Sequence, residues 1–200
     1  MDQRSDEWFA ARCGRITASR FKSVLAKTKS GASASRETYK WQIVAERLTG
    51  KVAESYTNSA MRWGTEQEAY ALAAYEWQTD KTVATAGFIP MGDYAGCSPD
   101  GLFGETQGLE IKCPFNSAVH LQTIDSNKMP AEHKPQVQGC MMVTERTSWD
   151  FVSFDPRMPQ NLKLFVTTVE LDLDYVDQLK VSIEQFNDEC AELIAKLNPT

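Results

Sequence analysis

Apolar and polar residues repeat along the chain in two different periods, which predict helices interspersed with short strands. We expect helices at residues 5–13, 17–27, 37–49, 58–80, 135–143 and 173–197, most of them from apolar residues spaced three and four apart. Short segments rich in β-branched and aromatic residues predict strands at 83–89, 94–98, 108–113, 148–154 and 164–169. Residues 28–36 are small and polar, and we expect a mobile loop there.

Single residues mark the ends of several predicted helices. Thr17 is a candidate N-cap, Gly50 a C-terminal stop and Pro135 a residue suited to a first helical turn. The last predicted helix carries an apolar stripe, which we expect to lie in the core or in a subunit interface. This order of elements predicts an α/β fold with a mixed central β-sheet flanked by helices.

The composition fits one domain and shows no membrane segment. Two hundred residues, 42% of them hydrophobic, suffice for one core, so we expect a single domain over residues 1–200. No apolar run approaches the roughly 20 residues of a membrane span, and the first residues lack the pattern of a secretory signal. Five widely spaced cysteines predict reduced thiols and a cytoplasmic protein. His120 and His133 stand far apart with no further ligands nearby, so we expect no zinc site.

Charge is unevenly distributed along the chain. The net charge is −6, but residues 1–51 carry eleven Lys and Arg against five Asp and Glu, whereas the remainder is strongly acidic. Six basic residues are clustered near the N-terminus: Arg12, Arg15, Arg20, Lys22, Lys27 and Lys29. They could form a phosphate-binding surface or an ordinary solvated helix face, and charge alone does not decide between the two.

Groups that can perform chemistry are concentrated in one stretch. Glu110 and Lys112 stand two apart on a predicted strand, so they project to one face while Ile111 faces a core. A bare D…E-x-K spacing is common, and these residues could simply decorate an exposed strand. Their neighbours Leu109 and Cys113 are apolar, however, and charged groups in such surroundings need each other or a metal ion.

A hairpin would bring a second carboxylate to this face. If strands 94–98 and 108–112 pair, Asp100 comes close to Glu110. Two carboxylates suit a hard cation such as Mg²⁺, and Lys112 could hold or deprotonate a water molecule. This combination is the chemistry of phosphodiester hydrolysis.

Two segments together resemble the PD-(D/E)xK nuclease core of phage lambda-type alkaline exonucleases. They are residues 98–102 (SPDGL) and 109–115 (LEIKCPF). Further segments resemble that family in the same order along the chain: residues 8–19, 63–68 (WGTEQE), 136–138 (QVQ) and 154–158 (FDPRM).

The resemblance implies a restriction-endonuclease-like fold and an enzyme that digests one strand of double-stranded DNA from a 5′-phosphorylated end, leaving a 3′ overhang. It implies two Mg²⁺ or Mn²⁺ ions, with Asp100, Glu110 and the Ile111 carbonyl as ligands. Lys112 would position the water nucleophile, and Glu68 would be a further acid on a helix. It also implies a ring-shaped homotrimer, a phage or prophage origin, and a single-strand annealing recombination protein as partner.

The same resemblance implies a pocket for the terminal 5′-phosphate, built from Arg12, Ser19, Ser98 and Gln136. A guanidinium forks onto phosphate oxygens, and hydroxyl and amide groups can donate to those that remain. Three of these residues also have an ordinary alternative. Arg12 could pair with an acid on its own helix, Ser19 could be a mid-helix residue, and Gln136 could cap a helix.

Three further residues complete the expectations. Lys29 would follow the DNA backbone, and Met61 would either part the terminal base pair as an apolar wedge or pack as a core methionine. The family pattern has another acid shortly before its Ser-Pro-Asp strand. Asp93 stands too close to Cys97 to match that acid, which leaves the full metal shell open.

Two other functions compete with the exonuclease. A sequence-specific endonuclease of the same superfamily would need an extra element to read base edges, for which 200 residues leave little room. A non-catalytic DNA-binding protein would have no need to keep Asp100, Glu110 and Lys112 together in an apolar setting.

Overall fold

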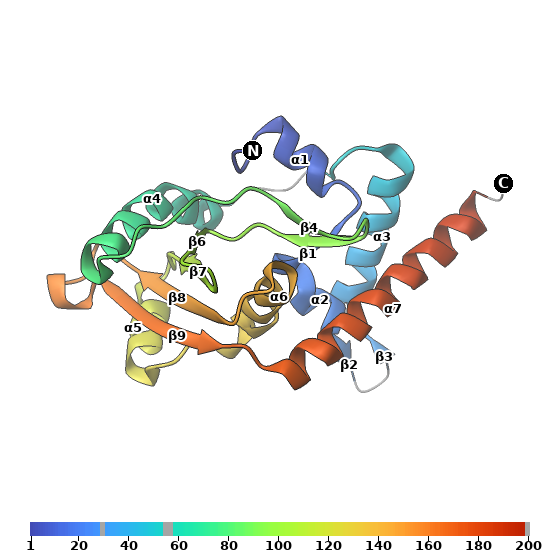
Figure 1. Ribbon diagram of the computed structural model, residues 1–200. Helices are drawn as coiled ribbons and strands as arrows, with labels where there is room; N and C mark the ends of the chain where they lie inside the picture. Colours follow the sequence, from blue (N-terminus) through green and yellow to red (C-terminus); the bar gives the residue numbers. More distant parts are fainter. Residues whose placement is uncertain (29–30, 54–57, 199–200) are drawn as a thin grey trace.

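Helices surround two small β-sheets in the computed structural model of the protein, which describes residues 1–28, 31–53 and 58–198 (Figure 1). Within these ranges the α-helices are α1 (Asp6–Arg12), α2 (Phe21–Leu25), α3 (Ala34–Thr49), α4 (Ser59–Thr79), α5 (Ser117–Ser126), α6 (Lys134–Thr144) and α7 (Leu173–Leu197). The 3₁₀-helices are η1 (Ala18–Arg20), η2 (Ala131–His133) and η3 (Gln160–Leu162). The strands are β1 (Ile16–Thr17), β2 (Lys27–Thr28), β3 (Gly31–Ala32), β4 (Ile89–Met91), β5 (Ala95–Cys97), β6 (Gly101–Phe103), β7 (Gln107–Lys112), β8 (Ser148–Phe154) and β9 (Leu164–Glu170).

The strands are divided between two mixed sheets and a small ribbon. One sheet has the order β1-β5-β4, the other β6-β7-β8-β9, and β2 pairs with β3. In the larger sheet β7 and β8 are parallel, whereas β6 and β9 run antiparallel to their neighbours. Helices α5 and α6 lie between β7 and β8 in the sequence and supply the crossover that a parallel pair requires. The predicted mixed α/β fold is confirmed.

Strand β8 separates two hydrophobic clusters, and all seven of its residues are buried. On one side Trp149 packs with residues of α2, α3, α6 and α7. On the other side Val152 packs with Ile111 of β7 and Tyr75 of α4. Residues of β7 and β8 paired in the parallel register share a face, so Glu110, opposite Phe151, lies on the face away from α4.

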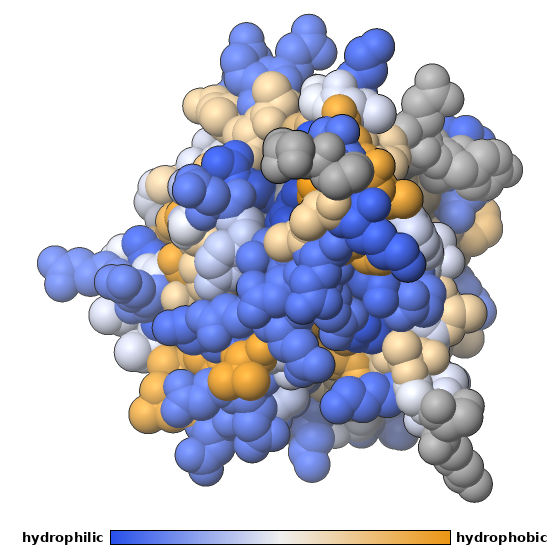
Figure 2. All heavy atoms as spheres, turned by 90° about the vertical axis from the view of Figure 1, so that its right-hand side faces the viewer, coloured by the Kyte–Doolittle hydropathy of each residue, from blue (hydrophilic) through white to orange (hydrophobic). Residues whose placement is uncertain are grey.

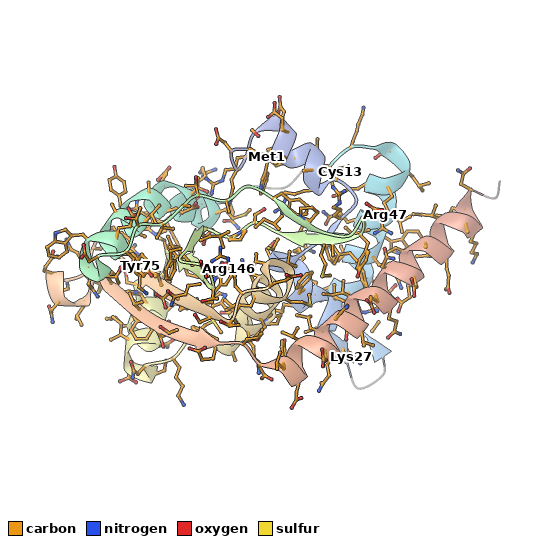
Figure 3. The ribbon with its side chains drawn as sticks, in the orientation of Figure 1. Met1, Cys13, Lys27, Arg47, Tyr75 and Arg146 are labelled. Atoms are coloured by element: carbon orange, nitrogen blue, oxygen red, sulfur yellow. The ribbon has the colours of Figure 1, made fainter. Side chains whose placement is uncertain are left out.

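Two polar arrangements fix the larger sheet. Buried Asp150 of β8 accepts hydrogen bonds from Tyr75 Oη (2.6 Å), Lys81 Nζ (2.7 Å) and Thr168 Oγ1 (2.7 Å), which fasten α4 to the sheet. Arg146 Nη1 donates to the carbonyl oxygens of Phe103, Gly104 and Gln107, which close the turn between β6 and β7. Figure 3 labels Tyr75 and Arg146 at these two places.

Most of the longer predicted elements are confirmed. Helix α4 matches the prediction for 58–80, α6 that for 135–143 and α7 that for 173–197. Strands β5, β7, β8 and β9 each fall in a segment predicted to be a strand. Gly50 ends α3 in the left-handed region at φ 65°, as its position predicts. The α7 stripe is core in its middle, where Leu179, Ile183 and Phe186 are buried.

Several short elements were predicted wrongly. Residues 17–27 form the end of β1, then η1, α2 and the start of β2, instead of one helix, and Thr17 makes no side-chain capping bond. In the segment 28–36, the described residues contribute to β2 and β3 and begin α3 at Ala34. The strand expected at 83–89 is only an isolated bridge from Ala84 to Leu102, followed by β4 from Ile89.

The predicted hairpin is also wrong. Strand β5 pairs with β1 and β4, and the antiparallel partner of β7 is the three-residue strand β6, which no prediction included. Helix α5 was missed as well.

Among the described residues, no helix is both long and apolar enough to cross a membrane.

Figure 2 shows the side of the molecule that lies on the right in Figure 1, where α7 runs outward. Hydrophilic side chains cover most of this face, and hydrophobic ones form small separate patches.

Candidate active site

Strand β7 carries the centre of the candidate site. Glu110 and Lys112 project from the same face, as the alternation of a strand dictates. Lys112 Nζ donates a hydrogen bond to Glu110 Oε1 and another to Gln136 Oε1 of α6 at 3.3 Å. Glu110 is 1% exposed and Lys112 is about one-third exposed. The lysine therefore connects a buried carboxylate to the surface.

Asp100 joins this centre through the backbone of the same strand. It precedes β6, and since Gly101 is paired with Leu109 in the antiparallel register, Asp100 lies beside the end of β7. Asp100 Oδ2 accepts a hydrogen bond from the Ile111 N–H at 2.6 Å. The expected approach of Asp100 to Glu110 is thus achieved by β6, not by the hairpin that we predicted.

The three charges perturb one another. Burial raises the pKa of Asp100 well above its ordinary value, and the neighbouring charge of Glu110 raises it further, although Lys112 opposes this. Burial alone would lower the pKa of Lys112, but the charges of Glu110 and Asp100 outweigh it and raise the pKa. The charges of Glu110 and Asp100 thus keep Lys112 protonated, whereas burial favours the neutral form of Asp100.

One atom of the centre has no partner. Glu110 Oε2 is buried without a hydrogen bond, and an unsatisfied buried carboxylate oxygen is costly unless something binds it. Among the described residues, no three His, Cys, Asp or Glu side chains are already grouped as a metal site. The oxygens available to a cation are those of Asp100 and Glu110 and the carbonyl of Ile111, the residue that follows Glu110.

Glu68 approaches the centre from α4. Its charge adds to the rise in the pKa of Asp100, although less than burial and Glu110 do. Its Oε2 accepts a hydrogen bond from Arg4 Nη2 at 2.7 Å. Asp93, in contrast, lies exposed between β4 and β5.

A second polar group lies next to Asp100 in the sequence. Ser98 Oγ accepts hydrogen bonds from Arg12 Nη1 (3.2 Å) and from Trp8 Nε1 (2.9 Å). The Arg12 guanidinium also lies 4.0 Å from the centre of the Trp8 ring, and burial lowers its pKa. Among the described residues, no carboxylate forms an ion pair with Arg12, so the alternative of a partner on its own helix is wrong.

Arg12 also lines an open cleft between α1, α3 and the beginning of α4, with a volume of about 780 Å³. We call it the arginine cleft, because five arginines line it: Arg4, Arg12, Arg15, Arg20 and Arg62. Ser19 and Met61 line it too. Met61 is 49% exposed, so its alternative interpretation as a core methionine is wrong. Ser19 is exposed on η1 and not in the middle of an α-helix.

The remaining predicted residues lie elsewhere. Gln136 is inside α6 and accepts from Lys112, so it does not cap a helix. Ser98 and Gln136 are not among the residues that line the arginine cleft. They lie beside the acidic centre, by which we mean Asp100, Glu110 and Lys112: Gln136 accepts from Lys112, and Ser98 is two residues before Asp100. Lys29 lies outside the described residues. His120 is a buried core histidine whose ring nitrogens contact Ser153 Oγ and the Leu162 carbonyl, each at 2.7 Å.

Sequence reasoning missed two residues of the site. Trp8 contacts both Arg12 and Ser98, and Arg4 contacts Glu68. Trp8 lies four residues before Arg12, and this helical spacing could have indicated that their side chains are neighbours. No local signal connects Arg4 with a residue 64 positions further along the chain.

The fold and this arrangement of charges define a class of protein. Residues 7–147 match the sequence pattern of the YqaJ-like viral recombinase domain, and the chain belongs to that family. This confirms the resemblance to lambda-type exonucleases that the motifs indicated.

Solved structures place the chain among particular relatives. An alkaline exonuclease from Laribacter hongkongensis, LHK-Exo, is 38% identical, with 96% of each chain covered and a TM-score of 0.88. LHK-Exo in complex with dAMP matches with a TM-score of 0.89 at the same identity and coverage. A phage-related exonuclease from Haemophilus somnus 129PT shares the fold, with 13% identity, a TM-score of 0.70 and 92% and 96% of the two chains covered. No curated protein matches the sequence significantly.

Proposed function

We propose that the protein is a Mg²⁺-dependent DNA exonuclease that digests one strand of a duplex in the 5′→3′ direction and leaves a 3′ overhang. The observation that carries the proposal is the convergence of Asp100, Glu110 and Lys112 at one end of β7, with an unsatisfied buried oxygen on Glu110. The relationship to an alkaline exonuclease over 96% of the chain supports it.

The acidic centre suits a divalent cation. Asp100 and Glu110 supply hard carboxylate oxygens, and the unsatisfied Glu110 Oε2 would gain the partner that it lacks. The Ile111 carbonyl and Glu68 would complete the set of oxygens around two ions. Such ions make bound water more acidic and stabilise charge on a phosphate that is being cleaved.

Lys112 serves this site as a hydrogen-bond donor. Its raised pKa keeps the ammonium group charged at neutral pH, so it holds water or a phosphate oxygen by hydrogen bonds instead of removing a proton. Glu110 and Gln136 fix its position from two elements, β7 and α6. A positioned donor of this kind stabilises negative charge as it develops on the phosphate.

Arg12 and Ser98 give the enzyme its direction. Arg12 donates a hydrogen bond to Ser98, which is two residues before Asp100 in the chain, and Ser19 lines the same cleft as Arg12. A guanidinium without a carboxylate partner is available to a terminal phosphate. With Gln136 at the edge of the acidic centre, these residues would hold the 5′-phosphate so that the adjacent phosphodiester reaches the cation site.

The assembly and setting follow from the same proposal. Three copies forming a ring would keep basic residues toward the DNA and leave the acidic remainder outside, which reconciles a net charge of −6 with DNA binding. The 3′ overhang would pass to a single-strand annealing protein, in the cytoplasm of a bacterium that carries the phage or prophage.

The test uses linear duplex DNA labelled at either end, with a 5′-phosphate or a 5′-hydroxyl group, in the presence of Mg²⁺. We expect mononucleotides to be released from the phosphorylated 5′ end, and chelation of the metal to stop the reaction. Arg12→Gln should remove most of the preference for a 5′-phosphate, whereas Lys180→Gln, at an exposed position of α7 that does not line the cleft, should keep it.

Other outcomes identify the competing functions. Cutting of covalently closed plasmid would indicate an endonuclease. DNA binding without any digestion would indicate a non-catalytic protein. Digestion that is indifferent to the end group in the unaltered protein would contradict the phosphate pocket.

A further inference from the structure

Arg4 lies between the arginine cleft and the acidic centre. It lines the cleft, and its Nη2 donates to Glu68 Oε2 at 2.7 Å. Glu68 in turn is one of the charges that raise the pKa of Asp100. Arg4 is thus the cation that contacts the outermost acid of the centre.

The backbone holds Arg4 in a conformation that is unfavourable for its residue type. Its φ is 70°, in the left-handed region that non-glycine residues rarely adopt. The preceding residue, Gln3, fixes the segment by donating through Nε2 to the carbonyls of Ala86 (2.9 Å) and Pro99 (2.7 Å). Such conformations persist where the surroundings enforce them, and they are concentrated at functional sites.

The segment also packs closely against the strand region beneath it. A Cβ added at Gly87 would lie 2.5 Å from the Met1 carbonyl oxygen, so a side chain there would displace the N-terminal residues. Pro99, which accepts from Gln3, precedes Asp100 directly. The N-terminal segment is therefore attached to the loop that carries Asp100, near α1 and α4 (Figure 1).

The ion pair itself is easily exchanged. The side chain of Arg4 is 48% exposed and that of Glu68 34%, and ion pairs at such exposure contribute little to stability. A planar guanidinium binds a carboxylate and a phosphate with the same fork of donors. Both kinds of partner are within the reach of Arg4 only because it lies where the cleft meets the centre.

We propose that Arg4 is an exchangeable counter-ion of the site. It neutralises Glu68 while no divalent cation is bound, and it turns to a phosphate of the DNA in the cleft when a cation takes its place. This inference rests on the proposed function. It makes Arg4 a positioning residue that couples metal binding to DNA binding.

Calorimetric titration with Mn²⁺ in the absence of DNA tests the first half. Arg4→Gln removes the competing cation, so we expect its affinity for Mn²⁺ to be about two- to five-fold higher than that of the unaltered protein. Arg62→Gln removes the same charge from the same cleft, but Arg62 bonds to Ser59 and not to Glu68. Its affinity for Mn²⁺ should be unchanged.

The outcomes of the titration are separable. Equal affinities of the unaltered protein and Arg4→Gln would overturn the exchange and leave the proposed function intact. An equal gain in Arg62→Gln would overturn it too, because the effect would then come from the general charge of the cleft. If the unaltered protein bound no Mn²⁺, the proposed metal site itself would be contradicted.

The salt dependence of DNA binding tests the second half. In a Lys112→Gln background, which slows digestion by orders of magnitude, we expect Arg4→Gln to reduce the slope of log K against log salt by about one with Mn²⁺ present. In EDTA, Arg4→Gln should leave the slope unchanged, because without a divalent cation Arg4 remains paired with Glu68 and does not contact the DNA. A reduction of the same size in both conditions, or in neither, would overturn the exchange.

Discussion

Lys112 Nζ donates a hydrogen bond to Glu110 Oε1, two residues earlier on β7. The pair is asymmetric, because Glu110 is 1% exposed while Lys112 reaches the surface. The second oxygen of Glu110 remains free to bind another group. Lys112 therefore occupies only one of the two oxygens of the Glu110 carboxylate, and the other oxygen can still bind a cation.

Replacement of this lysine should affect chemistry more than binding. We expect Lys112→Gln to lower the cleavage rate by about 10²–10³-fold, the range typical of the loss of one positioned hydrogen-bond donor. DNA affinity measured by fluorescence anisotropy should change less than ten-fold. Single-turnover digestion of end-labelled duplex checks the rate, and circular dichroism confirms the fold. A rate within ten-fold of the unaltered enzyme would contradict the proposed role.

The indole of Trp8 should support recognition of the 5′-phosphate without contacting the reacting atoms. Trp8→Phe keeps a ring beneath Arg12 but removes the N–H that donates to Ser98. We expect the preference for 5′-phosphate over 5′-hydroxyl ends, expressed as a ratio of kcat/KM, to fall about five-fold, as one lost hydrogen bond implies. Trp8→Leu should lower it further. A ratio that is unchanged in Trp8→Leu would show that Trp8 is only a packing residue.

Gly108 should not tolerate a side chain. A Cβ at this position on β7 would lie 2.3 Å from the ring of Trp149, so Gly108→Ala forces this fully buried ring out of its place in the core. We expect it to lower the free energy of unfolding by about 1–3 kcal/mol. Gly64→Ala is the matched control, because nothing lies within 4 Å of the added carbon. Urea denaturation should show no loss of stability there, and an equal loss in both variants would contradict the clash.

Asp155 should make stability depend on pH in acid. Burial alone would raise its pKa, but hydrogen bonds from Arg157 and Ser117 outweigh burial and lower the pKa to about 2. An acid with a lowered pKa in the folded state stabilises the protein above its ordinary pKa near 3.9, and this contribution is lost as the pH falls toward 2. We expect about 2 kcal/mol over that range.

Asp155→Asn provides the comparison. Asparagine does not ionise in this range, so the free energy of unfolding of the variant should change less between pH 4 and pH 2 than that of the unaltered protein. Denaturation by urea at several pH values measures the difference. Parallel curves for the two proteins would contradict the lowered pKa.

The sequence predicted the face of β7 but not its partners. Alternation alone places Glu110 and Lys112 on one side and Ile111 in the core, because the period of a strand is a property of its backbone. Strand β6 is three residues long, too short to show a pattern, so the hairpin was assigned to 94–98 instead. Its first residue, Gly101, follows Asp100 directly, which explains why the carboxylates meet even though the pairing was wrong.

Contacts between distant elements account for the other errors. Residues 17–27 have a helical spacing of apolar positions, yet Ile16 and Thr17 pair with Ala95 and Gly96 and take the strand conformation that this pairing requires. The candidate phosphate-binding residues were predicted from the resemblance of their segments to the family, because no spacing in the sequence indicates that they lie together. Trp8 and Arg4 were missed because their contacts depend on how α1 and the N-terminal residues pack.

The chain from Ser98 to Asp100 has a consequence for the length of the product. Two residues span at most about 7 Å, and they join the residue that meets Arg12 to the residue that meets Ile111. Given the proposed roles of these residues, this stretch of backbone sets the distance between the site for the terminal phosphate and the site of cleavage. Lengthening it by one residue should change the size of the released fragment while leaving the capacity to cut intact.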